Sequence, residues 1–122
     1  MNLEDVIKKI ISLPLEFNRV GNDKSIYSLL RDTGYFSLHD KINENNILGV
    51  LCNHLNFVEY WLTWSEDKRS RDGWYFLKKD NNKYIVGFIG FDSKNQKYLE
   101  FDDVVSACAA FIKKEIESIR VG

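Results

Sequence analysis

Two histidines and two cysteines are the side chains of this 122-residue chain best suited to bind a metal ion or to act in nucleophilic chemistry. Cys52 and His54 lie two positions apart, whereas His39 and Cys108 are distant from them in the sequence. A structural zinc site needs three or four ligands at defined spacing, and this single C-x-H pair lacks the second half of such a set. We therefore predict no metal site, and expect Cys52 to face the core from a helix whose exposed end is marked by His54.

Nucleophilic catalysis would need an imidazole and an orienting carboxylate beside Cys52 or a serine. The chain has no G-x-S-x-G turn and no glycine-rich phosphate loop, and Gly87 and Gly90 lack the third glycine of a dinucleotide site. A bulge or close packing beneath the last helix is the expected reason for these glycines. The sequence thus predicts no enzyme and no cofactor. The alternative is a small enzyme or ligand-binding domain whose pocket, between sheet and helices, has His39, His54 or Cys52 nearby.

A dense charged segment between two tryptophans, Trp64 and Trp74, is the unusual local feature. Reversal of the chain in a hairpin needs only two to five residues, so a loop of this length suggests another use. Mixed charges flanked by aromatic side chains are typical of protein-binding surfaces, although a solvated loop with internal ion pairs would have the same composition. If the segment binds a partner, the predicted contact residues are Glu66, Asp67, Arg69, Arg71, Asp72 and Trp74.

Composition limits the class of protein. Apolar side chains make up 44% of the chain and aromatic ones 14%, which is enough for a core that excludes water. The 17 basic and 18 acidic residues leave a net charge of -1, so no global field would attract nucleic acid. The length and the absence of repeats predict a single domain over residues 1–122.

Membrane insertion and export are not predicted. No apolar run approaches the roughly 20 residues that span a bilayer, and the first residues are acidic where a signal peptide is basic. We expect a cytoplasmic protein, in which Cys52 and Cys108 are reduced thiols rather than a disulfide.

Three helices are predicted before residue 57. The first has a helical spacing of Leu3, Val6, Ile7 and Ile10, and Pro14 predicts an end or kink close behind it. Residues 25–31 form the second, with Gly34 as its terminator. Asn43 or Asn45 can cap the third, whose expected buried stripe is Ile47, Leu48, Leu51 and Leu55.

Strands are predicted from Phe57 onward, where the period of the pattern changes to two. Residues 57–64 read as a strand that places one set of side chains on a single face: Val58, Tyr60, Leu62 and Trp64. Residues 74–79 and 84–91 are rich in aromatic and β-branched side chains, and the Asn81-Asn82 pair between them tolerates the positive φ of a tight hairpin. A polar turn at 92–96 and a short strand at 97–101 are expected to follow.

The last segment predicts a helix that Asp102 or Asp103 caps. Its apolar stripe consists of Val104, Val105, Cys108, Ile112, Ile116 and Ile119, and its expected solvent side of Lys113, Lys114, Glu115 and Glu117. The predicted fold class is therefore α+β. An antiparallel β-meander of three to four strands would carry N-terminal helices and a C-terminal helix packed on the sheet.

Several short stretches carry a family resemblance. They are Trp64-Ser65 with Asp67-Lys68-Arg69, Gly73-Trp74-Tyr75-Phe76, Tyr84 with Val86-Gly87, and Ala107-Cys108-Ala109 with Phe111-Ile112-Lys113. Through these stretches, the part of the chain over residues 64–113 resembles a cytoplasmic immunity protein of a bacterial contact-dependent growth-inhibition or related polymorphic-toxin system. The resemblance implies a non-enzymatic inhibitor of the C-terminal toxin domain, commonly a nuclease, of a secreted effector. We expect it to cover the toxin's active site or substrate groove, and its net charge of -1 argues against simple mimicry of nucleic acid.

Overall fold

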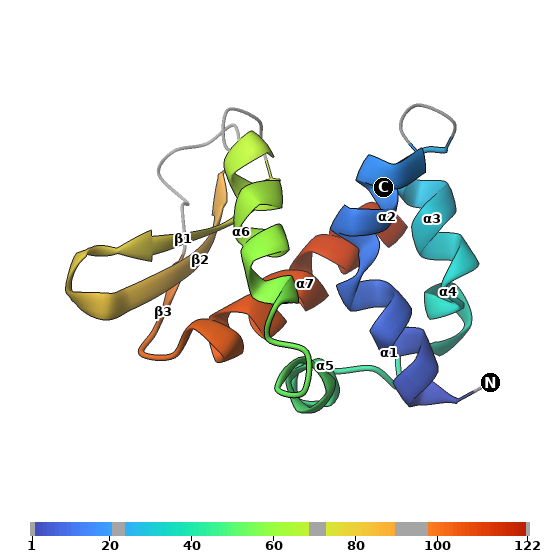
Figure 1. Ribbon diagram of the computed structural model, residues 1–122, viewed down its shortest axis with the longest axis horizontal. Coiled ribbons are helices and arrows are strands. Elements are labelled where there is room, and N and C mark those ends of the chain that lie inside the picture. Colours follow the sequence, from blue (N-terminus) through green and yellow to red (C-terminus); the bar gives the residue numbers. More distant parts are fainter. Residues whose placement is uncertain (1, 21–23, 69–72, 90–97, 122) are drawn as a thin grey trace.

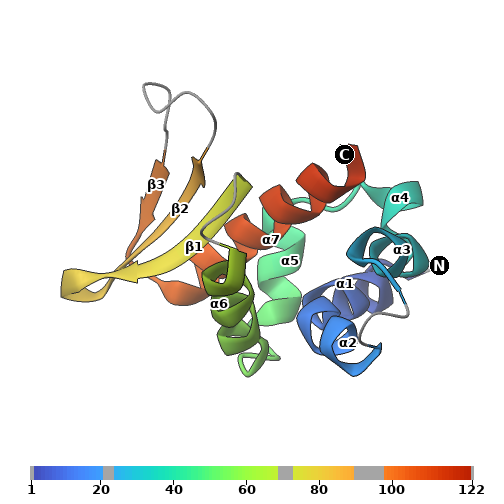
Figure 2. The same ribbon diagram turned by 90° about the horizontal axis from the view of Figure 1, so that it is seen from above.

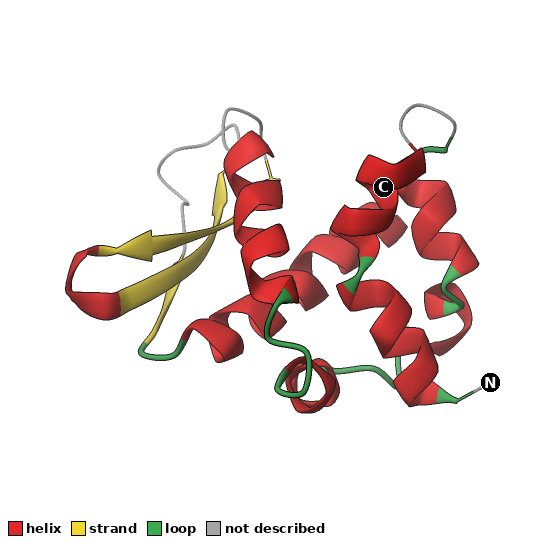
Figure 3. Cartoon of the chain, viewed as in Figure 1, coloured by secondary structure: helices red, strands yellow, loops and turns green. Residues whose placement is uncertain are grey.

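The computed structural model describes residues 2–20, 24–68, 73–89 and 98–121. Its elements follow the predicted order of helices, antiparallel sheet and closing helix, which confirms the α+β class (Figures 1 and 3). The helices before the sheet are α1 (Leu3–Ile11), α2 (Leu13–Val20), α3 (Ile26–Asp32), α4 (Tyr35–Leu38), α5 (Glu44–Leu51) and α6 (Phe57–Lys68). The sheet contains β1 (Gly73–Lys79), β2 (Lys83–Ile89) and β3 (Tyr98–Phe101), and the last helix is α7 (Val104–Val121).

Local sequence signals set the boundaries of the first helices. Ser12 ends α1, and Pro14 lies in the first turn of α2, where its missing N–H has no intrahelical partner to lose; the predicted break there is confirmed. The Ser25 hydroxyl caps α3, and Gly34, with a φ of 92°, follows the end of that helix as predicted. Two of these first helices were not predicted from the periodicity: α2, and the short helix α4, which begins at Tyr35.

Helix α5 begins at a reciprocal cap. The Asn43 side chain accepts a hydrogen bond from the Asn46 amide, and the Asn46 side chain accepts one from the Asn43 amide. Asn43, rather than Asn45, is therefore the cap. Of the predicted stripe, Ile47 and Leu51 are buried.

The end of α5 corrects two expectations. The helix ends at Leu51, and Cys52 at its C-cap is exposed instead of facing the core. Leu55 lies beyond the helix and is also exposed. The expected burial was wrong at both positions because the helical period does not continue past Leu51.

The predicted strand over residues 57–64 is wrong, because this segment forms helix α6. Apolar side chains occupy both alternate sets of positions there, so a period of two did not separate a core face from a solvent face. In the structure Val58, Trp61 and Ser65 are buried, at helical spacings of three and four. The Trp61 indole donates a hydrogen bond of 2.9 Å to the Ile11 carbonyl, which ties α6 to α1.

The sheet is a three-stranded antiparallel meander in the order β1-β2-β3. Val86, at its centre, pairs with Phe76 on β1 and with Leu99 on β3. Phe76 and Val86 are buried beneath α7, so the sheet contributes its central residues to the core.

The predicted hairpin between β1 and β2 is confirmed. Asn81 and Asn82 have φ values of 70° and 60°, the left-handed conformation that asparagine tolerates better than most residues. The short strand predicted over residues 97–101 is observed as β3, over Tyr98–Phe101. The predicted turn at residues 92–96 lies outside the described residues.

Helix α7 packs on the sheet and continues among the other helices (Figure 2). The Asp103 carboxylate caps it by accepting hydrogen bonds from the amides of Val105 and Ser106. Burial on α7 includes the centre of the predicted stripe and is wider than predicted, covering Ala107, Cys108, Ala109, Ala110, Phe111, Ile112, Glu115 and Ile116.

Glu115 corrects the expected solvent side of α7. Its side chain is 1% exposed, because α6 packs against this part of the helix. The Trp64 indole donates a hydrogen bond of 2.9 Å to the Glu115 carboxylate. A buried carboxylate is tolerable only where such donors replace water.

Candidate functional site

The face of the sheet turned away from α7 has a central group of aromatic and aliphatic side chains. On the opposite face, the Phe76 ring stacks on Phe111 of α7 with the centroids 5.7 Å apart. Since neighbouring residues of a strand point to opposite faces, Tyr75, Leu77, Ile85 and Tyr98 lie on the outer face, and we call these four side chains the open sheet face. Charged residues at the hairpin end of the same face border them: Lys79, Lys83 and Glu100. Tyr98 is 58% exposed, and the other three side chains of the open sheet face are half-buried. A solvated sheet face is normally polar, so this composition indicates a candidate interface.

Gly87 permits the packing of one of these side chains. A Cβ atom at this position would overlap the hydroxyl of Tyr75, its partner on β1. The expected close packing at Gly87 is therefore present, but it involves the open sheet face rather than the underside of the last helix. Gly90 lies outside the described residues.

A hollow of about 330 Å³ lies between α6 and β1, beside the open sheet face. It is lined by Glu59, Leu62, Thr63, Ser65, Glu66, Tyr75, Phe76, Leu77 and Lys78. Two carboxylates of α6 therefore border Tyr75 and Leu77, and Lys78 adds one ammonium group. The hollow combines apolar contact area with charge at its rim, which is typical of protein interfaces.

The structure describes part of the predicted contact set. Glu66 is exposed in the last turns of α6 and lines the hollow, and Asp67 lies in the same helix. Arg69, Arg71 and Asp72 lie outside the described residues.

Trp74, the last predicted contact, lies on the face of β1 that is turned toward α7. It is half-buried, and its ring packs edge-on against Phe88 at 5.2 Å between centroids. The Lys114 ammonium lies 4.8 Å from the centre of the same ring. Trp74 and Glu66 therefore lie on different sides of β1. The sequence did not predict this arrangement, because it predicted a strand where the structure has the helix α6 that carries Glu66.

A polar cluster joins α4 to α7. The Tyr35 hydroxyl donates a hydrogen bond of 2.6 Å to Glu117, and Lys113 donates to that hydroxyl at 2.7 Å and to the His39 carbonyl at 2.9 Å. Burial, with the hydrogen bond to Glu117, raises the pKa of Tyr35 well above its usual range. Arg120 completes the cluster with a 2.7 Å hydrogen bond to Glu117. These contacts are made within the fold, and we interpret the cluster as structural.

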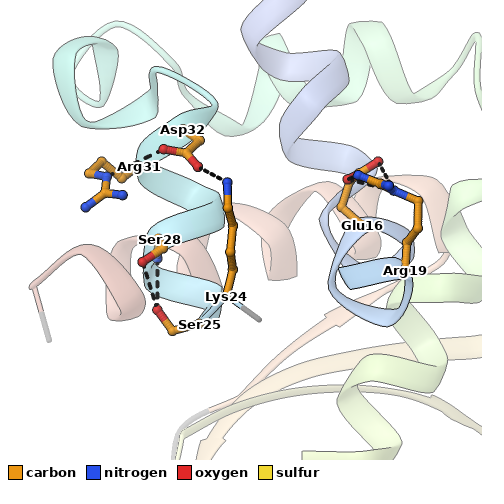
Figure 4. Close-up of polar contacts among 7 residues, drawn as sticks. All are labelled: Glu16, Arg19, Lys24, Ser25, Ser28, Arg31 and Asp32. Carbon is orange, nitrogen blue, oxygen red and sulfur yellow. Dashed lines mark hydrogen bonds and ion pairs between the residues drawn. The ribbon is translucent and has the colours of Figure 1, made fainter. Parts of the chain in front are cut away.

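A groove of about 340 Å³ between α2 and α3 has charged side chains at its rim (Figure 4). On α2, Arg19 donates a hydrogen bond of 2.9 Å to Glu16, which lowers the pKa of that carboxyl. Lys24 donates one of 3.0 Å to Asp32 on α3 and lowers the pKa of that carboxyl in the same way. The apolar residues that line this groove are Leu13, Val20 and Leu29.

The residues of the enzymatic alternative lie on different elements. His39 follows α4, with its ring 6.4 Å from that of Tyr35, whereas His54 precedes α6 and lines a shallow hollow beside Phe57. Within the described ranges, neither histidine forms an ion pair with a carboxylate. The described lining of the α6–β1 hollow includes neither histidine, and it does not include Cys52. No three histidine, cysteine, aspartate or glutamate side chains of the described chain gather closely enough to hold a metal ion.

No described helix combines the length and the apolar character needed to cross a membrane. Comparison of the chain with models of protein families, with curated proteins and with solved structures found no match. The assignment of a function therefore depends on the residues of this chain.

Proposed function

We propose that this chain is a protein-binding inhibitor, an immunity protein that binds and neutralises the C-terminal toxin domain of a secreted bacterial effector inside the producing cell. The resemblance over residues 64–113 supports the proposal, and this range includes the end of α6 and the whole sheet. The observation that carries it is the open sheet face, where aromatic and aliphatic side chains occupy positions that are normally polar.

Aromatic and acidic side chains would have separate roles in binding. Tyr75 and Tyr98 supply large contact areas at a low cost in side-chain entropy, as in the centres of many interfaces. Glu59 and Glu66 on α6 would attract a basic partner surface, such as the substrate groove of a nuclease, and speed association. Occlusion of that groove requires no catalysis by this chain.

The predicted contacts Glu66, Asp67, Arg69, Arg71 and Asp72 come in the sequence between the last turns of α6 and the start of β1. We propose that they form the charged rim of the interface, because rim charges mainly set association rate and specificity. Trp74 would contribute less than a fully exposed tryptophan, since Phe88 and Lys114 already cover part of its ring.

A growth assay tests the open sheet face. Leu77 and Ile85 face each other across β1 and β2, so the double variant Leu77→Glu, Ile85→Lys replaces an apolar pair by an oppositely charged one that a sheet surface tolerates. The proposal predicts that the gene immediately upstream encodes the cognate toxin domain, and cells producing that domain should lose protection with this variant. The control, Leu15→Glu with Leu55→Lys, introduces the same pair of charges at two exposed leucines elsewhere and should keep protection. Full protection by a folded Leu77→Glu, Ile85→Lys protein would contradict the proposal.

The α2–α3 groove favours a second candidate, a ligand-binding domain. Its volume lies at the lower end of the range for small-molecule pockets, roughly 300–1,000 Å³. A compound that raises the melting temperature of the parent chain, but not that of a Val20→Trp variant with a filled groove, would support this candidate.

A further inference from the structure

The two edges of the sheet differ in what covers them. At the β1 edge, α6 packs against the strand, and the Ser65 hydroxyl accepts the hydrogen bond of the Phe76 amide. At the β3 edge, the outer strand in Figure 2, no hydrogen bond beyond the sheet's own ladder involves the backbone of Tyr98 or Glu100 within the described residues. An edge strand with unpaired backbone groups can accept a further strand.

The contact at the opposite edge shows which backbone groups of β3 point outward. Because the Phe76 amide points away from β2, Phe76 and Val86 form a non-hydrogen-bonded pair, and the backbone groups of Val86 point toward β3. Val86 then exchanges its hydrogen bonds with Leu99, its partner on β3. The backbone N–H and C=O groups of Tyr98 and Glu100, on either side of Leu99, therefore point away from the sheet.

We propose that β3 pairs with β3 of a second copy of this chain, so that the two sheets join around a twofold axis at Leu99. In this register the outward backbone groups of Tyr98 meet those of Glu100 in the second copy, and the reverse pair forms by symmetry. The two Leu99 side chains, each 50% exposed in a single chain, then face each other and lose contact with water.

Charge and strand length favour this register over the two neighbouring ones. An axis at Glu100 would place two carboxylates directly opposite each other, which destabilises a strand pair. An axis at Tyr98 would place Leu99 and Glu100 opposite residues that precede the strand. The axis at Leu99 pairs each Glu100 with an uncharged tyrosine, and Glu100 keeps its ion pair of 3.8 Å with Lys79 of its own chain. The strand also contains neither lysine nor proline, two residues that commonly block pairing at edges.

The dimer would extend the open sheet face. A twofold axis perpendicular to the sheet keeps this face of both copies on one side and both α7 helices on the other. The paired strands have four residues each, so the contact is smaller than the roughly 800 Å² per partner of a typical stable complex. We therefore expect a dimer that forms with increasing concentration.

Cysteine cross-linking of the protein alone tests this inference. Residues that face each other in a non-hydrogen-bonded pair have Cα atoms about 4.5 Å apart, which suits a disulfide. A Leu99→Cys variant, made with Cys52→Ser to remove the exposed native thiol, should form a covalent dimer under mild oxidation. The matched control is Leu55→Cys in the same background, because Leu55 has a similar exposure of 54%, and it should remain mostly monomeric.

Sedimentation of the parent chain provides the second measurement. Its average mass should rise from 14.3 kDa toward twice that value with concentration, and Leu99→Lys, which places two ammonium groups opposite each other, should abolish the rise. A Leu99→Cys protein that cross-links no better than the Leu55→Cys control, or less well than a Glu100→Cys protein, overturns the proposal. So does a parent chain that stays monomeric at high concentration. No toxin takes part, so either failure leaves the proposed function untouched.

Discussion

The hydroxyl of Ser65 on α6 accepts a hydrogen bond from the backbone amide of Phe76 on β1, with 2.6 Å between Oγ and N. Ser65 is 2% exposed, so neither group can turn to water instead. The bond satisfies an edge amide of the sheet and fixes α6 beside the open sheet face. Ser65 therefore has a structural role and positions one wall of the proposed interface.

Removal of this hydroxyl should destabilise the chain. A Ser65→Ala variant leaves the Phe76 amide buried without an acceptor, which costs about 1–3 kcal/mol of unfolding free energy. The measurement is urea unfolding, with Thr63→Ala, an exposed position on the same helix, as the control for the change in helix propensity. Equal unfolding free energies for the two variants would contradict the structural role of Ser65.

Acid stability should depend on Glu117. Burial opposes its ionisation, but the hydrogen bonds from Arg120 and Tyr35 outweigh that effect and lower the pKa of the Glu117 carboxyl from 4.5 to about 2. In the unfolded chain, where its pKa is the ordinary 4.5, the Glu117 carboxylate binds a proton more tightly than it does in the fold. Glu117 therefore stabilises the fold above about pH 5, and this stability is lost as the pH falls toward 2.

A Glu117→Gln variant tests this pH dependence by thermal unfolding between pH 6 and pH 2. Its melting temperature should decline less steeply with acid than that of the parent, because the ionisable group has been removed. Glu59→Gln, which removes an exposed carboxylate, controls for the change in net charge. A slope for Glu117→Gln that equals the parent's would contradict the prediction.

The two thiols should react at very different rates. Cys52 is exposed at the end of α5, whereas Cys108 is buried in α7, and burial raises the pKa of the Cys108 thiol. With a disulfide reagent such as Ellman's, one thiol per folded chain should react quickly, and the second only after unfolding. A Cys52→Ser variant should lose the fast phase. Two fast thiols in the folded parent would be incompatible with the position of Cys108.

Charge reversal at the end of α6 should slow toxin binding. Glu66→Lys combined with Asp67→Lys replaces two acidic groups by basic ones, and we expect association with the toxin domain to slow about tenfold or more at low salt. Glu4→Lys with Asp5→Lys, on the exposed side of α1, is the matched control for net charge. Similar association rates for the two double variants would remove this end of α6 from the interface.

Trp74→Ala should be measured separately, because this residue packs against Phe88 and Lys114. Because Trp74 faces α7 and not the open sheet face, the variant is expected to lower the melting temperature and to speed dissociation from the toxin much less than Leu77→Glu, Ile85→Lys does. Faster dissociation at an unchanged melting temperature would mean that the packing contributes nothing to the fold.

Several element boundaries could be predicted because they depend on neighbouring residues. Pro14 separates two helices, Asn43 and Asp103 accept hydrogen bonds from the amides that follow them, and the Asn81-Asn82 pair forms its turn without distant contacts. Residues 57–64 could not be assigned in this way, since their apolar side chains fit either period. Only tertiary contacts, such as the bond from Trp61 to Ile11, select the helix.

The candidate site was predicted less well for a related reason. The sequence indicated charge near Glu66, but not that Glu66 and Tyr75 line one hollow, which depends on α6 being a helix. A signal for the open sheet face was present: Tyr75 and Leu77 alternate with the core residue Phe76, so both faces of that strand are apolar. Glu115 gave no such signal, because its burial results from the packing of α6 over α7.

Titration calorimetry between this purified chain and the toxin domain encoded immediately upstream is the most direct test of the proposed inhibition. We predict a complex with one toxin domain per chain and a dissociation constant of about 1 nM or tighter, which the Leu77→Glu, Ile85→Lys variant weakens at least about a hundredfold. Absence of any complex between the two unmodified proteins would contradict the proposal that this chain is an immunity protein.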